Sequence, residues 1–97
     1  STCDTDASNT SKPVINNSGG YPAGTTGAMV TDGEDPTTEI VVGYDIVNVN
    51  GVTIGTVSAR ASTGGAAGTV TCDTGTLIDV ANNEVLYICR IQIGFHY

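Results

Sequence analysis

The fold is decided by residues 38–61, which read TEIVVGYDIVNVNGVTIGTVSARA. Hydrophobic and polar residues alternate on both sides of Asn50-Gly51, and this dipeptide is the strongest short-range signal for a tight hairpin turn. We therefore expect one strand over 38–50, a type I′ turn at Asn50-Gly51 and a second strand over 52–61. The turn sets the pairing, which is Val49 with Val52, Val47 with Ile54, Tyr44 with Val57, Val42 with Ala59 and Ile40 with Ala61.

The alternation changes phase once in each of these two strands. In the first strand the change lies at Asp45-Ile46, and in the second it lies at Gly55-Thr56, which is opposite in the expected pairing. A shift of one residue turns every later side chain to the other face of a strand. The two matched shifts therefore predict a bulged ribbon that bends around one core, with Gly55 at the bend. The alternative is a long ribbon whose two ends bury different faces, one inside the domain and one against a partner.

A second hairpin is expected over 77–81 and 84–95, with its turn at Asn82-Asn83. Its pairs would be Val80 with Val85, Ile78 with Tyr87 and Thr76 with Cys89. The first half of its last strand is hydrophobic on both faces, which is typical of a strand in the middle of a sheet. The small residues of 62–68 predict a connection between the hairpins, and no stretch shows a helical period. The fold class is therefore all-β, a small antiparallel β-sandwich or barrel of about six or seven strands.

The N-terminal third differs in composition from the rest of the chain. Residues 1–37 are polar and interrupted by Gly and Pro, so we expect an extended arm and loops there and the β core over 38–97, within one domain. Such an arm cannot bury enough hydrophobic surface to offset its own chain entropy. Either the chain's own domain or a neighbouring copy must therefore hold the arm. We expect residues 1 to about 20 to make a large share of their contacts with another copy, with Val14 and Ile15 entering a groove on that neighbour.

Charge and composition narrow the choice of partners. The chain holds 3 Lys and Arg against 10 Asp and Glu, a formal charge of −7 at pH 7. This argues against nucleic acids and anionic membrane surfaces, because both require a basic face. No hydrophobic run approaches the roughly 18 residues of a membrane span. A chain rich in Thr, Gly, Asn and Ser, with little Lys, is typical of a protein outside the cell or on the surface of a particle.

The sequence shows no convincing catalytic residues. Asp73-Thr74-Gly75 resembles the tripeptide of aspartic proteases, a family in which two such aspartates share a proton. Here the tripeptide lies late in the chain, and the hydrophobic segment with Gly that those enzymes carry downstream has no room, so we expect an ordinary turn. The one histidine, His96, lies seven residues after Cys89 on the opposite face of the expected strand, which argues against a Cys-His pair.

Cofactor and metal sites are not expected either. Two oxygen-rich clusters faintly resemble calcium loops, Asp4, Asp6, Ser8 and Asn9 in one and Asp32, Glu34 and Asp35 in the other. Neither has the central Gly and the closing Glu of an EF-hand, so we interpret both as solvated loops. Three cysteines and one histidine match no zinc spacing. The Gly64-Gly65 stretch lacks the lysine of a phosphate-binding loop.

The three cysteines Cys3, Cys72 and Cys89 leave one thiol unpaired. In a simple meander Cys72 and Cys89 lie two strands apart, about 9–10 Å, which is too far for a disulfide. A bond between them requires the loop after Cys72 to cross between sheets. The alternatives are a bond from Cys3 to either of them, within the chain or between chains, and buried thiols.

Together these features predict a non-enzymatic structural subunit of an extracellular homopolymer, pilus-like or otherwise filamentous. Its partners would be other copies of the chain, joined by exchange of a strand or arm in a head-to-tail contact. We expect no cofactor and no small-molecule ligand. The alternatives are a decoration or cement protein on a virus capsid, and a small secreted module that binds glycan or calcium.

Overall fold

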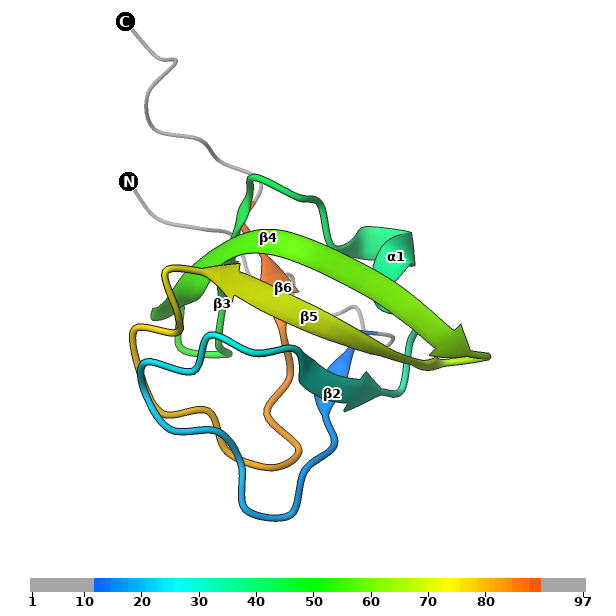
Figure 1. The fold of residues 1–97 in the computed structure, drawn as a ribbon, viewed down its shortest axis with the longest axis horizontal. Helices are drawn as coiled ribbons and strands as arrows, with labels where there is room; N and C mark the ends of the chain where they lie inside the picture. Colours follow the sequence, from blue (N-terminus) through cyan, green and yellow to red (C-terminus); the bar gives the residue numbers. More distant parts are fainter. Residues whose placement is uncertain (1–11, 90–97) are drawn as a thin grey trace, which may run out of the picture.

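The computed structural model describes residues 12–89, whose strands form one antiparallel sheet that curls into a half-barrel (Figure 1). The strands are β1 (Val14–Ile15), β2 (Met29–Asp32), β3 (Asp45–Val47), β4 (Thr53–Gly64), β5 (Ala67–Asp73) and β6 (Tyr87–Ile88), and the helix is α1 (Pro36–Glu39). The prediction of a small all-β fold is confirmed. The one helix of the described residues is too short to span a membrane.

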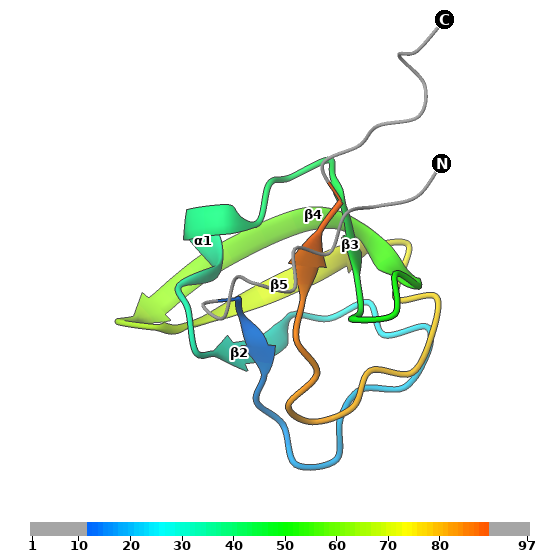
Figure 2. The same ribbon diagram turned by 180° about the vertical axis from the view of Figure 1, so that it is seen from behind.

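The order of strands in the sheet is β1-β2-β5-β4-β3-β6. β4 and β5 form a long curved hairpin, and β3 and β6 lie behind it, as Figure 2 shows from the other side. The lead-in to β6 also reaches β1, because Val14 forms a bridge with Val85. The Leu86 amide donates to the Pro13 carbonyl at 2.9 Å, and the Ile15 amide donates to the carbonyl of residue 84 at 2.9 Å. The two ends of the curled sheet therefore meet at β1, which protects strand edges from outside pairing.

The hairpin of β3 and β4 confirms the predicted pairing in its middle. The Val57 amide donates to the Tyr44 carbonyl at 2.9 Å, and Ile46 lies opposite Gly55. Directly after Ile46 the register shifts, so that Val47 lies opposite Thr53. The matched phase changes therefore mark a β-bulge, as predicted. Both faces of β3 are covered within the chain: Ile46 belongs to the main core, and Val47 belongs to a smaller cluster with Tyr87 and Cys89.

The turn itself is wider than predicted, so the pairs Val49 with Val52 and Val47 with Ile54 are wrong. The Asn48 amide donates to the Val52 carbonyl at 2.9 Å, which leaves three residues in the loop. Asn48 Oδ1 accepts hydrogen bonds from the amides of Asn50 and Val52, both at 3.0 Å. Gly51 has a positive φ of 81°, whereas Asn50 does not, so the two-residue type I′ turn is absent.

The first predicted strand starts seven residues too early, and the pairs Val42 with Ala59 and Ile40 with Ala61 are wrong. Asp35 caps a helical turn that begins at Pro36, a residue suited to the first position of a helix. The chain then turns at Gly43, whose φ is 93°, and β3 begins at Asp45. The connection expected over 62–68 is also wrong, because these residues continue β4 and begin β5 around a short turn at Gly65-Ala66.

The second predicted hairpin does not form. Its turn is present, since the Glu84 amide donates to the Ala81 carbonyl at 3.1 Å and Asn83 has a φ of 69°. Its strands find other partners: Val80 forms a bridge with Tyr21, and Tyr87 pairs with Val47. The loops 16–28 and 74–84 therefore run side by side below the sheet, in the lower half of Figure 1.

The core lies inside the curl of the sheet. Its fully buried side chains come from every strand and from the end of α1, and include Ile15, Met29, Ile40, Ile46, Ile54, Val57, Val70 and Leu86. Burying one such side chain contributes about 1.5–3 kcal/mol to folding. Two of these residues, Ile15 and Met29, come from the N-terminal third, so β1 and β2 are part of the folded sheet.

Candidate functional site

The structure places Val14 and Ile15 in the chain's own sheet. On one side they pair with Asp32 and Thr31 of β2, and on the other they face residues 84–86. We call the space between β2 and residues 84–86 the β1 groove. Ile15 is 0% exposed there, so in the single chain the hydrophobic anchor of the arm fills the chain's own groove. The sequence predicts that Val14 and Ile15 enter a groove on a neighbouring copy, and the single chain contains such a groove itself.

A tight turn follows β1 and sets the direction in which the strand enters the groove. The Gly20 amide donates to the Asn17 carbonyl at 2.7 Å, and Asn17 Nδ2 donates back to the Gly20 carbonyl at 2.7 Å. Asn82 Oδ1 accepts from the Asn17 amide at 3.0 Å and ties the turn to the loop beside it. Gly20 has a φ of 67°, and a Cβ there would collide with the Val80 carbonyl oxygen. Residues 17–20 therefore form a tight turn that requires glycine at position 20.

A lysine fastens the other end of β1. Lys12 is 5% exposed, and its Nζ lies 2.6 Å from Oε1 of Glu39 at the end of α1. Lysine is almost never this buried without a partner. Glu34 lies near this pair, and its pKa is raised, first by burial and then by repulsion from Glu39. We call Lys12, Glu34 and Glu39 the lysine cluster. The sequence did not predict it, because Lys12 and Glu39 lie 27 residues apart.

The acidic stretch Asp32, Glu34 and Asp35 is divided among three elements: Asp32 ends β2, Glu34 belongs to the lysine cluster and Asp35 caps α1. Asp35 Oδ1 accepts from the Thr37 amide at 2.9 Å and from Thr37 Oγ1 at 2.7 Å, and these bonds lower its pKa. Within residues 12–89 no group of three potential metal ligands is found. The other predicted cluster, over residues 4–9, lies outside the described residues.

Asp73-Thr74-Gly75 is a turn at the end of β5, as predicted. The Gly75 amide donates to the Cys72 carbonyl at 3.2 Å, and both Thr74 and Gly75 have positive φ. Asp73 is exposed and lies opposite Thr56 in the sheet. His96 lies outside the described residues.

The structure describes two of the three cysteines, Cys72 and Cys89. Cys72 is a free, buried thiol, so it is not bonded to Cys89 within the chain. Burial raises the pKa of Cys72 to about 11. Cys89 is buried beside Val47 and Tyr87. A bond from Cys3 to Cys89, within the chain or between chains, stays a prediction because Cys3 lies outside the described residues.

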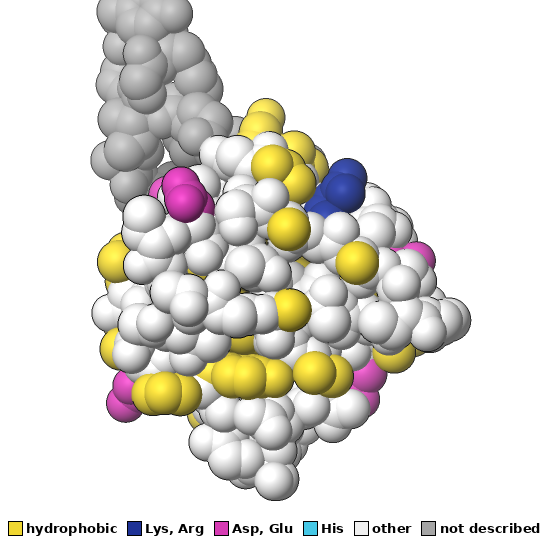
Figure 3. Space-filling view, viewed as in Figure 1, with side chains coloured by type: hydrophobic (Ala, Val, Ile, Leu, Met, Phe, Trp, Pro, Cys, Tyr) yellow, Lys and Arg dark blue, Asp and Glu magenta, His cyan; other side chains and the backbone are white. Residues whose placement is uncertain are grey.

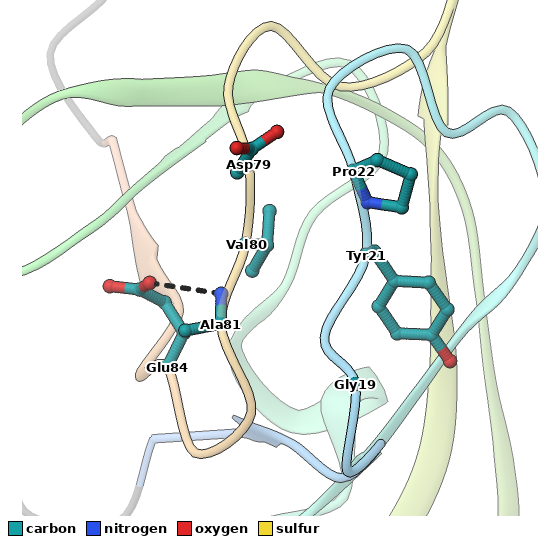
Figure 4. Close-up of a pocket in the computed structure, with 7 residues that line it drawn as sticks. All are labelled: Gly19, Tyr21, Pro22, Asp79, Val80, Ala81 and Glu84. Atoms are coloured by element: carbon teal, nitrogen blue, oxygen red, sulfur yellow. Dashed lines mark hydrogen bonds between the residues drawn. The ribbon is translucent and has the colours of Figure 1, made fainter.

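A cavity of about 350 Å³ lies between the two lower loops. Its walls are Gly19, Tyr21, Pro22, Asp79, Val80, Ala81 and Glu84. Asp79 already accepts from the Ala23 amide at 2.8 Å, and Glu84 accepts from the Ala81 amide at 3.3 Å. In Figure 4 the two carboxyl groups and the Tyr21 ring point away from one another. Because these groups do not converge, the cavity lacks the arrangement of a ligand site.

Apart from Asp73 at its end, the outer face of β4 and β5 carries small, uncharged side chains. Ala59 lies opposite Thr71, and Ala61 lies opposite Thr69. In Figure 3 the charged side chains lie at the margins of this face. The two cations among residues 12–89 are both used near α1, since Lys12 pairs with Glu39 and Arg60 Nε donates to the Ile40 carbonyl.

Comparison with known proteins gives no relative: no family model, no curated protein and no solved structure matches the chain.

Proposed function

We propose that this chain is a non-enzymatic structural subunit of an extracellular, filamentous homopolymer whose copies exchange β1. The observation that carries the proposal is the position of β1, the first strand of the sheet. It is two residues long, it lies between β2 and residues 84–86, and Ile15 fills the core beneath it. A short terminal strand held in a groove by another part of the sheet is the element that strand-exchanging polymers transfer between copies.

Exchange costs little energy, because every hydrogen bond that β1 breaks within its own chain forms again in the same way between two chains. The turn at residues 17–20 would act as the hinge of the exchange. When it opens, the five residues 16–20 extend over about 17 Å and carry β1 away from its own groove. The next copy then fills the empty groove. Such a head-to-tail contact need not close into a ring, so it extends into a filament.

The surface is consistent with repeated packing of copies. Apart from Asp73, the outer face of β4 and β5 has no charges to keep neighbouring subunits apart, although the whole chain carries a formal charge of −7. Its Thr and Ala side chains also need little ordering when another surface covers them. The location that we propose, outside the cell or on a particle, is supported by a composition rich in Thr, Gly, Asn and Ser with little Lys.

A disulfide staple across β1 tests the exchange. Val14 and Val85 lie opposite each other between two hydrogen-bonded pairs, a position where Cα atoms approach to about 4.5 Å and a disulfide fits. The variant Val14→Cys with Val85→Cys should assemble when reduced and stay monomeric when oxidised, measured by light scattering and negative-stain microscopy. Mass spectrometry without reduction would verify the bond.

The matched control is Tyr21→Cys with Val80→Cys, which staples the neighbouring bridge and leaves β1 free. The oxidised control should assemble like the wild type. Normal assembly of the oxidised 14–85 variant would exclude exchange of β1. A wild-type chain that stays monomeric at every concentration would exclude the polymer itself.

A further inference from the structure

We propose that the lysine cluster is a pH-sensitive latch on β1, which holds the strand in mild acid and releases it more readily at neutral pH. Its consequence for assembly rests on the proposed exchange of β1, but the latch itself is a property of the single chain. Lys12 directly precedes Pro13, whose carbonyl accepts the hydrogen bond from Leu86. The ammonium group is thus placed where β1 enters its groove.

The latch has one ammonium group and two carboxylates. Nζ of Lys12 is bonded to Glu39, and Glu34 has an oxygen, Oε1, that is shielded from water and has no hydrogen-bond partner in the described part of the chain. A buried acceptor without a donor is unfavourable, and more so when it carries charge. Ionised Glu34 therefore opposes the closed latch, whereas the bond from Lys12 to Glu39 supports it.

The neighbouring charged groups are engaged elsewhere. Asp35 caps α1 through Thr37, and Arg60 is bonded to the Ile40 carbonyl. Asp32 lies opposite Val14 at the end of β2. Besides Lys12 and Arg60, no cation lies within residues 12–89 to neutralise Glu34.

The direction of the pH effect follows from burial. In the closed state the pKa of Glu34 is raised by burial, by repulsion from Glu39 and by repulsion from Asp35. The positive charge of Lys12 lowers it. Opening exposes Glu34 to water and removes Lys12, and burial is the larger of these two influences. The closed state therefore binds the proton more tightly than the open state. Its stability rises as the pH falls through the raised pKa of Glu34, and this gain is absent at pH 7.

Amide exchange measured by NMR tests the latch in the single chain. The amides of Ile15 and Leu86 report β1, and that of Val57, bonded to Tyr44, reports the rest of the sheet. After correction for intrinsic rates, protection of Ile15 and Leu86 should rise between pH 7 and pH 5 while that of Val57 stays constant. Glu34→Gln should give the high protection at both pH values.

The matched control is Asp73→Asn, which removes the same charge from an exposed turn and should keep the pH dependence of the wild type. A wild-type chain whose β1 protection is the same at pH 5 and pH 7, or a Glu34→Gln variant that still depends on pH, would overturn the latch. The outcome is separable from the staple experiment. A latch that behaves as expected in a chain that assembles despite the 14–85 staple would leave the latch standing and remove strand exchange.

Discussion

β1 and the hairpin of β4 and β5 belong to the same sheet but are held in different ways. β4 and β5 are long, adjacent in sequence and joined by a short turn, so few residues must be ordered to bring them together. β1 has two residues, and its partners are β2 and Val85, which lies 71 residues further along the chain (85 minus 14). The hairpin is held along its length by its own backbone, whereas β1 depends on Ile15 and on fastenings at its two ends. We therefore expect β1 to leave the sheet more readily than β4 or β5.

The largest expected effect comes from disturbing the hairpin. A Cβ on Gly68 would collide with the Ala61 carbonyl oxygen and lie 2.5 Å from ring atoms of Pro36. Because backbone and a proline ring cannot yield easily, Gly68→Ala should lower the free energy of unfolding by about 3 kcal/mol, the upper end of the usual cost of overpacking. Urea denaturation would measure this. Gly27→Ala is the control, since a Cβ at Gly27 meets nothing within 4 Å. Equal stability of the two variants would show that the hairpin is loosely packed.

Truncating the anchor of β1 should have the next largest effect. Ile15→Ala removes a side chain that is 0% exposed, so unfolding should become easier by about 2–3 kcal/mol. Amide exchange should show the loss of protection first at Leu86 and only later at Val57, because β1 detaches before the hairpin opens. Val14→Ala, at the half-buried neighbour, should cost less. If the Leu86 and Val57 amides lost protection together, the contrast between the two regions would be wrong.

Weakening the ion pair of Lys12 with Glu39 should lower the free energy of unfolding less than truncating Ile15 does. Glu39→Gln leaves the lysine buried beside a neutral partner, and we expect a loss of about 1–2 kcal/mol, since the pair is only partly shielded from water. Thermal denaturation at pH 7 would detect it. The charge-matched control is Asp79→Asn in the lower loops, which lies away from β1 and should change the melting temperature less. A larger effect of the control would indicate that β1 is not fastened by its lysine.

The smallest effect concerns the thiol inside the hairpin. Cys72 is buried with a pKa of about 11, above its ordinary value, so iodoacetamide at pH 8 should not label Cys72 in the folded chain but should label it in the unfolded chain. Because the folded pKa is raised, the neutral thiol favours the folded state below the ordinary pKa, and this contribution is lost as the pH rises toward 11. Fast labelling of Cys72 in the native chain would show that the hairpin opens as readily as β1.

Local signals in the sequence were sufficient for the centre of the sheet. The matched phase changes gave the bulge between β3 and β4 and the pairing of Tyr44 with Val57, because both depend on the alternation of a few neighbouring residues. The turn at Asn82-Asn83 was also found, because turn residues act over three or four positions.

Long-range pairing could not be read in the same way. Val80 and Val85 are suitable hairpin partners by pattern, yet they pair with Tyr21 and Val14, which supply equally hydrophobic partners from the N-terminal third. The early start of the first predicted strand has a local cause that was missed: Asp35 followed by Pro36 is a helix-start signal and outweighs the β-branched residues after it. The lysine cluster joins segments 27 residues apart, and no periodicity connects them.

The placement of β1 also sets an order of events during synthesis. A ribosome adds about 5–20 residues per second, so Val85 follows Val14 by about 4–14 s. Throughout that interval the residues of β1 have been synthesised, whereas residues 84–86 on one side of its groove have not. The same topology that joins the two ends of the sheet thus leaves Val14 and Ile15 without their partners on one side until residues 84–86 have been translated.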